Sequence, residues 1–480
     1  MDTLAEPRKS AAGREDRRTI AQFLVDDFVL LEDSAIPDAV LERTVLCFVD
    51  TIGVALAAAG MGVGTAAAAI AVKSPEGPSS VWGSGRGASM TDAAFANGML
   101  SHALDFDDTH TAAIMHSSCM VVPVAVAIGQ GLRLSARRIL SAAVVGYEVA
   151  GRLGRLAPGP FQNNGFQATS VLGAFAATAI AARLLGLDRR QAVHAFGIAG
   201  SMASGLMEYL ADGSDVKQMH AGWSAQAGIR AAQLAAEGFT GPATIFEGRF
   251  GVFRSFTRLS IDPGSALRFR PKTWEVELMG PKPYPACLCV HPLVQAVLDI
   301  KARLRGEGMG IDDIADIRCH VPDWYVNLIF EPVAAKAAVA SSYEARFSAP
   351  YCIGRALLDD RLTLESFAPA KLRDPAIGRV ASRVTYEVED LPEFPEAFPA
   401  RVVVTTQSGK KLESYIRHNL GSPGNPLAAS QYDEKFLAAT APFVPREQAR
   451  SLLGAIKGLS HRGGEQEFFR TLENLVISRA

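Results

Sequence analysis

The sequence has no excess of either charge. Its 48 basic and 50 acidic side chains leave a formal net charge of -2. A protein without a strong positive field has little general attraction for nucleic acid or for an anionic membrane surface. We therefore expect neither partner, and the binding of any anion has to depend on a local group of side chains.

The sequence also has few cysteines and no apolar segment of the kind that a secretory leader needs. Its six cysteines are scattered over 480 residues, and only Cys287 and Cys289 lie close together. This C-x-C pair lacks the second pair that a structural zinc site requires. Residues 1–20 carry charges of both signs and are expected to form a mobile arm. The pattern favours a reducing, cytoplasmic location.

Long runs without charge are limited to one stretch. Residues 51–72 contain no charged side chain, a length that could span a membrane. They are mostly alanine and glycine, and Gly60, Gly62 and Gly64 interrupt them, so we expect a buried helix, a turn and the start of another helix. The composition, 48% hydrophobic and 20% charged, is typical of a globular protein, and the length favours two or three domains.

Helical patterns dominate the first half of the chain. Residues 89–104 open with a Ser-x-x-Asp capping pattern, and residues 169–185 form an alanine-rich run that ends at Gly186. Residues 223–237 repeat this design. Small side chains let helices pack closely. The patterns predict an all-helical domain over residues 21–265.

The pattern changes near residue 265. Alternating β-branched residues predict strands, whereas two intervening segments keep helical spacing. The predicted strands are residues 314–321, 382–389 and 400–418, the last folding back on itself through a Ser-Gly-Lys turn, and the predicted helices are residues 292–305 and 343–358. These elements predict an α+β domain over residues 266–420.

Helical patterns return after about residue 432. We expect residues 421–480 to rejoin the first domain. The predicted fold is therefore mainly α, with a smaller α+β lid domain inserted into a large all-helical domain.

The segment HALDFDDTH, residues 102–110, concentrates titratable groups. If the helix from Ser89 continues through it, His102, Asp105 and Thr109 fall on one face at positions i, i+3 and i+7. That face would hold a base, a carboxylate and a hydroxyl. A solvated acidic surface is the alternative interpretation.

A second histidine, His116, stands just before the apolar run MVVPVAVAI. A histidine at such a boundary suits a proton shuttle, because a small pKa shift places its titration near neutral pH. The same position is also typical of a structural, hydrogen-bonded histidine.

Two later segments place a lysine and a histidine close to a predicted helix start. They are Lys217 with His220, and Lys282 with His291 on either side of Cys287. Helix N-termini favour anions, so together these segments indicate a site for a small multi-carboxylate ligand, with phosphate as an alternative. Each lysine taken alone is compatible with a solvated surface side chain.

Two further motifs lack the context that they need. GSGRGA, residues 83–88, fits a loose dinucleotide-binding pattern, but the preceding KSPEGPSSVW supplies no buried strand. Asp105 and Asp108 could bind magnesium together with Asp212 and Asp215, but no set of arginines and lysines for a diphosphate surrounds them.

Several stretches, in the same order along the chain, resemble the MmgE/PrpD family, whose members include 2-methylcitrate dehydratase, cis-aconitate decarboxylase and iminodisuccinate epimerase. They are HALDFDDTH, HSSCMVVP, NNGFQATSVLGAF, VKQMHAGWSAQAGIRAAQLAAEGFTGP, KPYPACLCVH and EARFSAPYCIGRALLDDRL. The resemblance implies a helical domain with a smaller α+β lid, a homodimer, and an active site between the domains that uses neither cofactor nor metal. It also implies proton transfer next to a carboxylate of a small di- or tricarboxylate.

The resemblance also implies roles for individual residues. His116 matches a catalytic acid/base, and Lys217 and Lys282 match cations that bind carboxylate or relay protons. The positions that match substrate-binding or site-shaping residues are Asp105, Thr109, Gln167, His220, Cys287, His291 and Tyr325.

This chain departs from the family pattern at two of these positions. Gln167 follows Gly165 and Phe166 where relatives usually have a histidine, and Cys287 stands where some relatives have one. A glutamine binds carboxylates but cannot exchange a proton at neutral pH. The favoured function is a dehydratase-like lyase, with an epimerase or a decarboxylase of the same family as alternatives. A non-catalytic carboxylate-binding protein is the alternative from another class.

Overall fold

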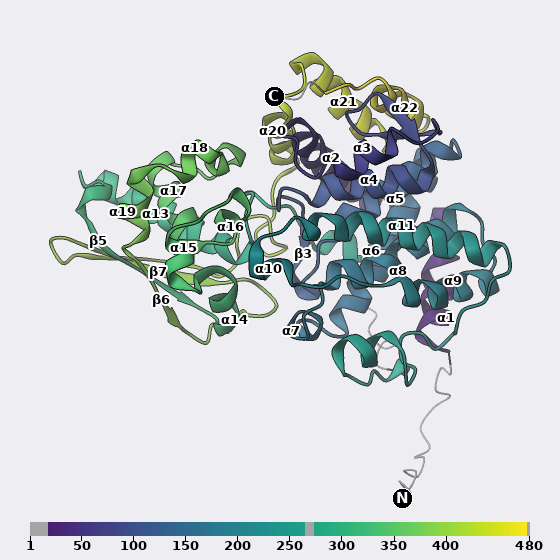
Figure 1. The fold of residues 1–480 in the computed structure, drawn as a ribbon, viewed down its shortest axis with the longest axis horizontal. Coiled ribbons are helices and arrows are strands. Elements are labelled where there is room, and N and C mark those ends of the chain that lie inside the picture. The colour runs from purple at the N-terminus through teal and green to yellow at the C-terminus, as the bar shows by residue number, and fades with distance from the viewer. Residues whose placement is uncertain (1–17, 265–272, 478–480) are drawn as a thin grey trace, which may run out of the picture.

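The computed structural model describes residues 18–264 and 273–477. Most of the predicted N-terminal arm, residues 1–20, lies outside the described residues. Figure 1 shows a large helical part beside a smaller part that contains a sheet. The prediction of a mainly α fold is confirmed.

The helical part is built from two sections of the chain. Its helices before residue 240 are α1 (Ile20–Leu24), α2 (Asp38–Gly60), α3 (Ala66–Ala71), α4 (Met90–His102), α5 (Ser118–Gly131), α6 (Ala136–Arg155), α7 (Pro160–Asn163), α8 (Ala168–Leu184), α9 (Arg189–Met202), α10 (Tyr209–Asp212) and α11 (Val216–Ala236). Its helices near the end of the chain are α20 (Ala429–Thr440), α21 (Arg446–Gly458) and α22 (Gly464–Glu473).

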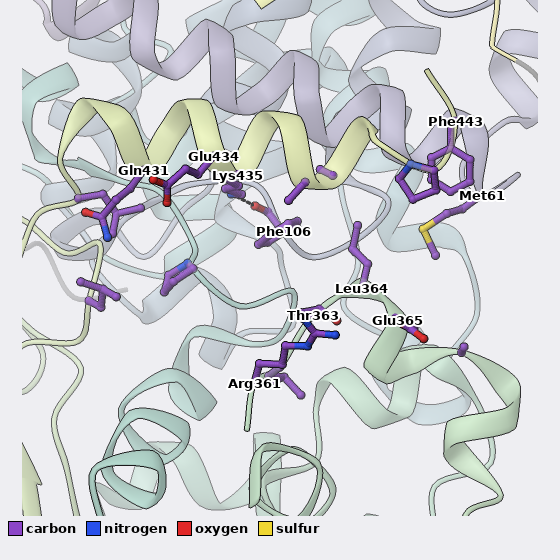
Figure 2. A pocket seen from close by; sticks show the side chains of 18 residues that line it. Met61, Phe106, Arg361, Thr363, Leu364, Glu365, Gln431, Glu434, Lys435 and Phe443 are labelled. Carbon is purple, nitrogen blue, oxygen red and sulfur yellow. Dashed lines mark hydrogen bonds between the residues drawn. The ribbon is translucent and has the colours of Figure 1, made fainter. Parts of the chain in front are cut away.

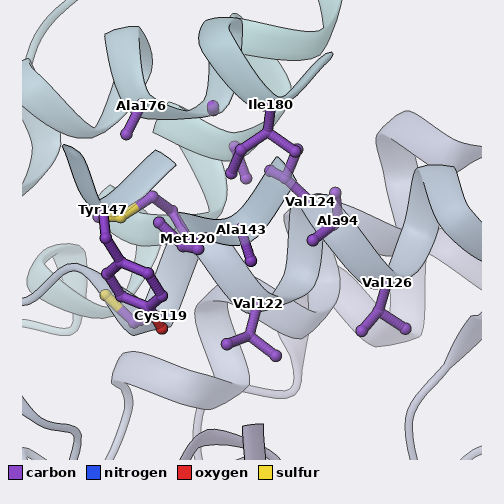
Figure 3. Close-up of a cluster of buried hydrophobic side chains, with 14 of the residues drawn as sticks. Ala94, Cys119, Met120, Val122, Val124, Val126, Ala143, Tyr147, Ala176 and Ile180 are labelled. Carbon is purple, nitrogen blue, oxygen red and sulfur yellow. The ribbon is translucent and has the colours of Figure 1, made fainter. Parts of the chain in front are cut away.

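Helix α5 forms the centre of this part. All of its residues from Ser118 to Gln130 are buried, as expected for a helix that is apolar on every side. Figure 3 shows Val122, Val124 and Val126 of α5 beside side chains of α4, α6 and α8. Many of these neighbours are alanines, so the helices approach closely and leave little space between them.

Helices α4 and α11 cross with their backbones in contact. A Cβ atom added to Gly98 of α4 would lie 2.9 Å from the Cα of Gly222 in α11. This close approach brings the first turn of α11 over the segment that follows α4, where HALDFDDTH lies.

The smaller part contains a four-stranded sheet in the order β6-β5-β7-β8. The strands are β5 (Ile314–Val321), β6 (Val384–Val388), β7 (Ala400–Thr406) and β8 (Lys411–Ile416). β6 is parallel to β5, and the other pairs are antiparallel. In β7 every second residue from Ala400 is buried, as expected for a strand with one face on a core. The three predicted strand segments are confirmed.

The helices of the smaller part are α13 (His291–Gly306), α14 (Asp323–Tyr325), α15 (Val333–Ala337), α16 (Ser342–Arg346), α17 (Ala349–Asp359), α18 (Pro369–Leu372) and α19 (Pro375–Ala381). Two short two-stranded sheets complete the described elements: β1 (Ser79–Val81) with β2 (Arg86–Ala88), and β3 (Thr109–His110) with β4 (Met279–Gly280). The first residues of the GSGRGA motif therefore form the turn of the β1–β2 hairpin, and its last three residues form β2.

The buried apolar side chains divide into two clusters. One contains residues between Ile20 and Met279 together with residues between Tyr432 and Ile477, and the other contains residues between Ala286 and Ile416. Both ends of the chain thus share one core, with the second core between them in sequence. The domain boundaries at residues 265 and 420, and the lid role of the smaller domain, stay predictions.

Three local predictions were wrong. Helix α4 ends at His102, because Asp105 adopts a left-handed backbone with φ 51°, so His102, Asp105 and Thr109 do not share a helical face. The helix predicted over residues 343–358 is two helices, because the hydroxyl of Ser348 caps a new start. Helix α11 begins at Val216, so Lys217 and His220 lie within its first turns and not before it.

The charge-free stretch of residues 51–72 falls in the end of α2, a turn and α3, as predicted. None of the helices within the described residues is long and apolar enough to cross a membrane.

Candidate active site

The three aspartates of HALDFDDTH are buried. Asp105, Asp107 and Asp108 expose 3%, 0% and 2% of their surface. The interpretation of this segment as a solvated acidic face is therefore wrong. Buried carboxylates need partners to offset their lost hydration, and each of these aspartates has a different set.

Asp105 binds two lysines. Its Oδ1 lies 2.5 Å from the Nζ of Lys217 and 3.1 Å from the Nζ of Lys282. Lys282 also donates a hydrogen bond to the carbonyl oxygen of Asp105, at 3.0 Å. Burial opposes ionisation of the carboxyl, but the two ammonium groups hold the pKa of Asp105 well below its usual range. The same contact raises the pKa of Lys217 despite its burial.

This arrangement is one carboxylate between two buried cations. Lys217 is 4% exposed and Lys282 is 1% exposed. Asp105 contacts both ammonium groups directly, and the Asp107 carboxylate interacts with both at longer range. Two ammonium groups that face one cavity can form charge-assisted hydrogen bonds with a ligand carboxylate.

Asp107 binds His102. Its Oδ2 accepts a hydrogen bond from Nδ1 of His102 at 2.7 Å and lies 3.7 Å from Nδ1 of His116. Burial alone would raise the pKa of Asp107, but the two rings lower it far below its usual value.

Two hydrogen bonds orient His116. Its backbone N–H donates to Oγ1 of Thr169 at 3.0 Å, and its ring Nδ1 lies 2.8 Å from the carbonyl oxygen of Asp108. Because a carbonyl oxygen can only accept, Nδ1 carries the ring proton and Nε2 carries the lone pair. No described residue hydrogen-bonds Nε2 of His116.

His116 is neutral at physiological pH. Burial lowers the pKa of His116 to about 3, and Lys282 adds to this effect, although the Asp107 carboxylate opposes it. An unprotonated imidazole with a free Nε2 is a general base.

Gln167 contacts two histidines at once. Its Nε2 lies 3.1 Å from Nε2 of His102, and its Oε1 accepts a hydrogen bond from Nδ1 of His220. Gln167 immediately precedes helix α8, whereas the two histidines belong to α4 and α11. The contact therefore joins three helices at the edge of the site.

A cavity of about 110 Å³ brings most of the predicted residues together. Seven of the ten line it: Asp105, Thr109, His116, Gln167, Lys217, Lys282 and Cys287. Side chains of the smaller part, among them Trp324, Phe347 and Phe398, complete its wall. The cavity thus lies between the two hydrophobic cores.

Three predicted site residues do not line this cavity. His220 lies behind Gln167, and His291 is buried, with its Nε2 3.1 Å from the carbonyl oxygen of Ala286. Tyr325 is fully buried against Phe394 and Phe398. In this structure these side chains support the wall of the site.

Sequence reasoning missed several lining residues. Thr169, which accepts a hydrogen bond from the backbone N–H of His116, lies in the family stretch NNGFQATSVLGAF but had no assigned role, and Gln162 directly precedes that stretch. Tyr209 comes from a segment with no recognised motif. Phe347 lies in the family stretch EARFSAPYCIGRALLDDRL but had no assigned role, and its ring lies 5.1 Å from the Nζ of Lys217. Only the tertiary structure places them at the site.

A larger cavity, of about 680 Å³, lies on the other side of Phe106. Figure 2 shows Lys435 beside Phe106 and a mainly apolar wall that includes Met61, Leu364 and Phe443. Lys435 donates to the carbonyl oxygen of Phe106 at 2.8 Å and lies 3.9 Å from the centre of its ring. No histidine lines this cavity, so acid/base chemistry favours the smaller one.

His102, Asp107 and Cys119 form the one cluster in the described part of the chain with metal-ligand spacing. The ring nitrogen and the carboxylate that would face an ion already share a hydrogen bond of 2.7 Å. Burial raises the pKa of the Cys119 thiol well above its usual value, whereas a metal needs the thiolate. The donor set therefore does not fit a metal ion.

Comparisons with known proteins agree with the resemblance. The MmgE/PrpD N-terminal domain matches residues 20–261, and the MmgE/PrpD C-terminal domain matches residues 284–459. A human cis-aconitate decarboxylase is 30% identical over 438 residues, which cover 88% of each chain. A cis-aconitate decarboxylase of Aspergillus terreus is 27% identical over 445 residues, covering 88% of this chain and 90% of the relative.

Proposed function

Because the chain belongs to the MmgE/PrpD family, we propose that it is a lyase that acts on a small di- or tricarboxylate without a cofactor or a metal ion. The activity for which its relatives are named, decarboxylation of cis-aconitate, supports a carboxylate as the substrate.

One observation supports this proposal most directly. The unprotonated Nε2 of His116 shares a cavity with the ammonium groups of Lys217 and Lys282. The lysines would bind a substrate carboxylate and stabilise negative charge that develops next to it. His116 would take a proton from the adjacent carbon and return it later.

Two lyase reactions fit this arrangement. In a dehydration, His116 removes a carbon-bound proton, and the hydroxyl group on the neighbouring carbon leaves as water after it gains a proton. In a decarboxylation, the bond to a carboxylate breaks, carbon dioxide leaves, and the electron pair left on carbon accepts a proton from water, which His116 relays. The names of the relatives make cis-aconitate the first substrate to test.

The test uses the purified, chelator-treated protein in heavy water with methylcitrate, citrate, cis-aconitate and iminodisuccinate, followed by proton NMR. A new vinyl signal or release of carbon dioxide would establish a lyase and identify the leaving group. Deuterium entering the substrate without either change would establish an epimerase. Binding detected by thermal shift without any reaction would support a carboxylate-binding protein.

Two variants test the site itself. His116→Gln is expected to lower kcat by about 10²–10⁴-fold, the usual contribution of a general base. Lys282→Ala is expected to raise KM and to lower kcat. If turnover by both variants equalled that of the unchanged protein, the cavity would not be the active site.

We also propose a cytoplasmic homodimer. All six cysteines are free in the structure, which suits a reducing compartment. The dimer follows from the family resemblance, and light scattering on the purified protein would test it.

A further inference from the structure

Gln167 occupies a fixed position between two buried histidines. Its side chain is buried, with 7% of the residue exposed, and its backbone N–H donates to the carbonyl oxygen of Gly205 at 2.9 Å. It is also the member of this contact that lines the cavity, whereas His102 and His220 lie behind it. Gln167 therefore connects the two buried histidines, His102 and His220, to the cavity.

The positions of the protons along the contact of His102, Gln167 and His220 can be assigned starting from Asp107. The Asp107 carboxylate can only accept, so the 2.7 Å contact with His102 requires a proton on Nδ1 of that ring. In neutral His102, Nε2 then carries the lone pair. The atom of Gln167 that faces it at 3.1 Å is the amide nitrogen, which donates.

The carbonyl oxygen of the Gln167 amide determines the tautomer of His220. With its nitrogen directed at His102, Gln167 directs Oε1 at Nδ1 of His220, and a carbonyl oxygen can only accept. Nδ1 of His220 therefore carries the proton. Burial lowers the pKa of His220 to about 4, and the positive charge of Lys217 adds to this effect, so this ring is neutral as well.

We propose that Gln167 is a positioning residue that fixes the tautomer of His220, matches the tautomer that Asp107 imposes on His102, and keeps both rings neutral. Asp107 then remains an unprotonated acceptor beside His116, which is left as the histidine that exchanges protons with a bound substrate. The effect on turnover rests on the proposed function, whereas the tautomers are a property of the protein without substrate.

The other groups around the rings are compatible with this assignment. His102 faces Asp107, the ring of His116 at a centroid distance of 5.3 Å, and the protonated thiol of Cys119. His220 faces Tyr209, with ring centroids 5.8 Å apart, and is influenced by the positive charge of Lys217. Among these groups only Asp107 favours a positively charged His102. The neutral ring already donates its Nδ1 proton to that carboxylate.

A carboxylate at position 167 would make His102 positively charged instead of neutral. In Gln167→Glu, His102 would lie between two carboxylates, and both would need a donor. The ring can satisfy both only by carrying a proton on each nitrogen, so it would become an imidazolium ion. Glutamate has nearly the shape of glutamine, so the change tests charge and not packing.

The matched control is Gln162→Glu. Gln162 lines the same cavity, but its amide donates to the carbonyl oxygen of Ile114 at 2.9 Å and contacts no histidine. This variant adds the same charge to the same cavity without touching the contact between Gln167 and the two rings.

The experiment is NMR of the full chain with ¹⁵N-labelled histidine, with His102→Gln and His220→Gln used to assign the two rings. In the unchanged protein at pH 7 both rings should show the neutral form with the proton on Nδ1. In Gln167→Glu the His102 signals should change to the doubly protonated form, and in Gln162→Glu they should not. A doubly protonated His102 in the unchanged protein, or identical His102 signals in Gln167→Glu, would overturn the proposal.

Gln167→Met provides a second variant if glutamate prevents folding. Methionine fills the space but offers neither the N–H donor nor the oxygen acceptor. His220 should then lose its single tautomer, whereas Asp107 should keep the proton of His102 on Nδ1. An unchanged His220 tautomer would again overturn the proposal.

Turnover separates this proposal from the proposed function. With an active substrate, Gln167→Glu should move the acidic limb of the pH profile of kcat/KM by about one pH unit or more, the scale of a nearby charge. If no substrate reacts, the proposed function fails while the NMR result still decides the role of Gln167. An active enzyme with shifted NMR signals and an unmoved pH profile would contradict the assigned effect on His116.

Discussion

The Nζ of Lys217 lies 2.5 Å from Oδ1 of Asp105, and both side chains are almost completely buried. The two residues are 112 positions apart in the sequence. Lys282, which is 177 positions from Asp105, binds the same carboxylate. The fold therefore holds two ammonium groups around one carboxylate before any substrate binds. Such preorganised charge costs no rearrangement during a reaction.

Replacing Asp105 by asparagine should destabilise the protein. Asp105→Asn leaves two buried ammonium groups without the carboxylate that contacts both, and breaking a buried ion pair typically costs about 3–5 kcal/mol. Urea unfolding should show this decrease in the free energy of unfolding. Turnover should fall by about 10²-fold or more, because the lysines lose the carboxylate that holds them in place.

A double variant distinguishes charge from packing. Lys282→Met removes one cation, so Asp105→Asn with Lys282→Met should regain part of the stability that Asp105→Asn loses, without regaining turnover. Equal free energies of unfolding for Asp105→Asn and the unchanged protein would contradict the importance of this ion pair.

Stability should depend on pH through Asp108. Burial raises the pKa of Asp108 from its ordinary 3.8 to about 7, with a contribution from the Asp50 carboxylate, although a hydrogen bond from Ser118 opposes the shift. A folded state with the higher pKa holds its proton more tightly than the unfolded state does. The stabilisation is therefore complete below about pH 4 and is lost as the pH rises through about 7.

Asp108→Asn isolates this contribution, because asparagine has a similar shape and does not titrate. The free energy of unfolding of the unchanged protein, relative to that of Asp108→Asn, should fall by up to about 1.4 kcal/mol per pH unit between roughly pH 4 and 7. Urea unfolding of both proteins at pH 5, 6 and 8 measures it. A difference that stayed constant, or that grew with pH, would show that Asp108 is ionised in the folded protein.

Local signals in the sequence predicted most of the elements. Strand β5 coincides with the predicted segment of residues 314–321, and α4 starts directly after Ser89, as the Ser-x-x-Asp capping pattern predicts. Both depend on neighbouring residues only: alternation along one strand, and a side chain that accepts from the backbone three residues later. Family membership, too, was evident from short motifs.

The geometry of the site could not be predicted in this way. Nothing near Asp105 indicates a left-handed backbone, because that conformation is stabilised by the distant Lys217 and Lys282. The two lysines looked like separate anion sites at two helix starts, whereas they converge on one carboxylate. The contact between Gln167 and His102 joins residues 65 positions apart, and only the packing of α4 against its neighbours creates it.

Cys287 should be the most reactive cysteine. Within the described part of the chain it is the one cysteine that is not fully buried, and it lines the cavity beside Lys282. A hydrogen bond from the Cys289 thiol lowers the pKa of Cys287, while burial raises that of Cys289. Thiolates react with alkylating reagents and thiols do not.

Brief treatment with iodoacetamide at pH 7.5 should therefore modify Cys287 at least about tenfold faster than the other cysteines, as peptide mass spectrometry would show. A bound carboxylate substrate should slow the reaction, and Cys287→Ser should abolish the fast phase. Faster modification of a different cysteine would contradict both the exposure and the thiolate character of Cys287.

The contact between α4 and α11 should tolerate no added methyl group. A Cβ atom at Gly222 would lie 2.4 Å from the carbonyl oxygen of Phe95, a backbone atom that cannot move without shifting α4. Gly222→Ala should lower the free energy of unfolding by about 1–3 kcal/mol. Turnover should fall too, because Lys217 lies on the same helix and would move relative to Asp105.

Gly454→Ala is the matched control, since Gly454 lies in helix α21 with no atom within 4 Å of an added Cβ. Alanine favours a helix by about 0.5–1 kcal/mol over glycine, so this variant should be slightly more stable and fully active. Thermal and urea unfolding compare the two. If Gly222→Ala were as stable as Gly454→Ala, the two helices would not be in backbone contact, and their crossing would not position Lys217 over Asp105.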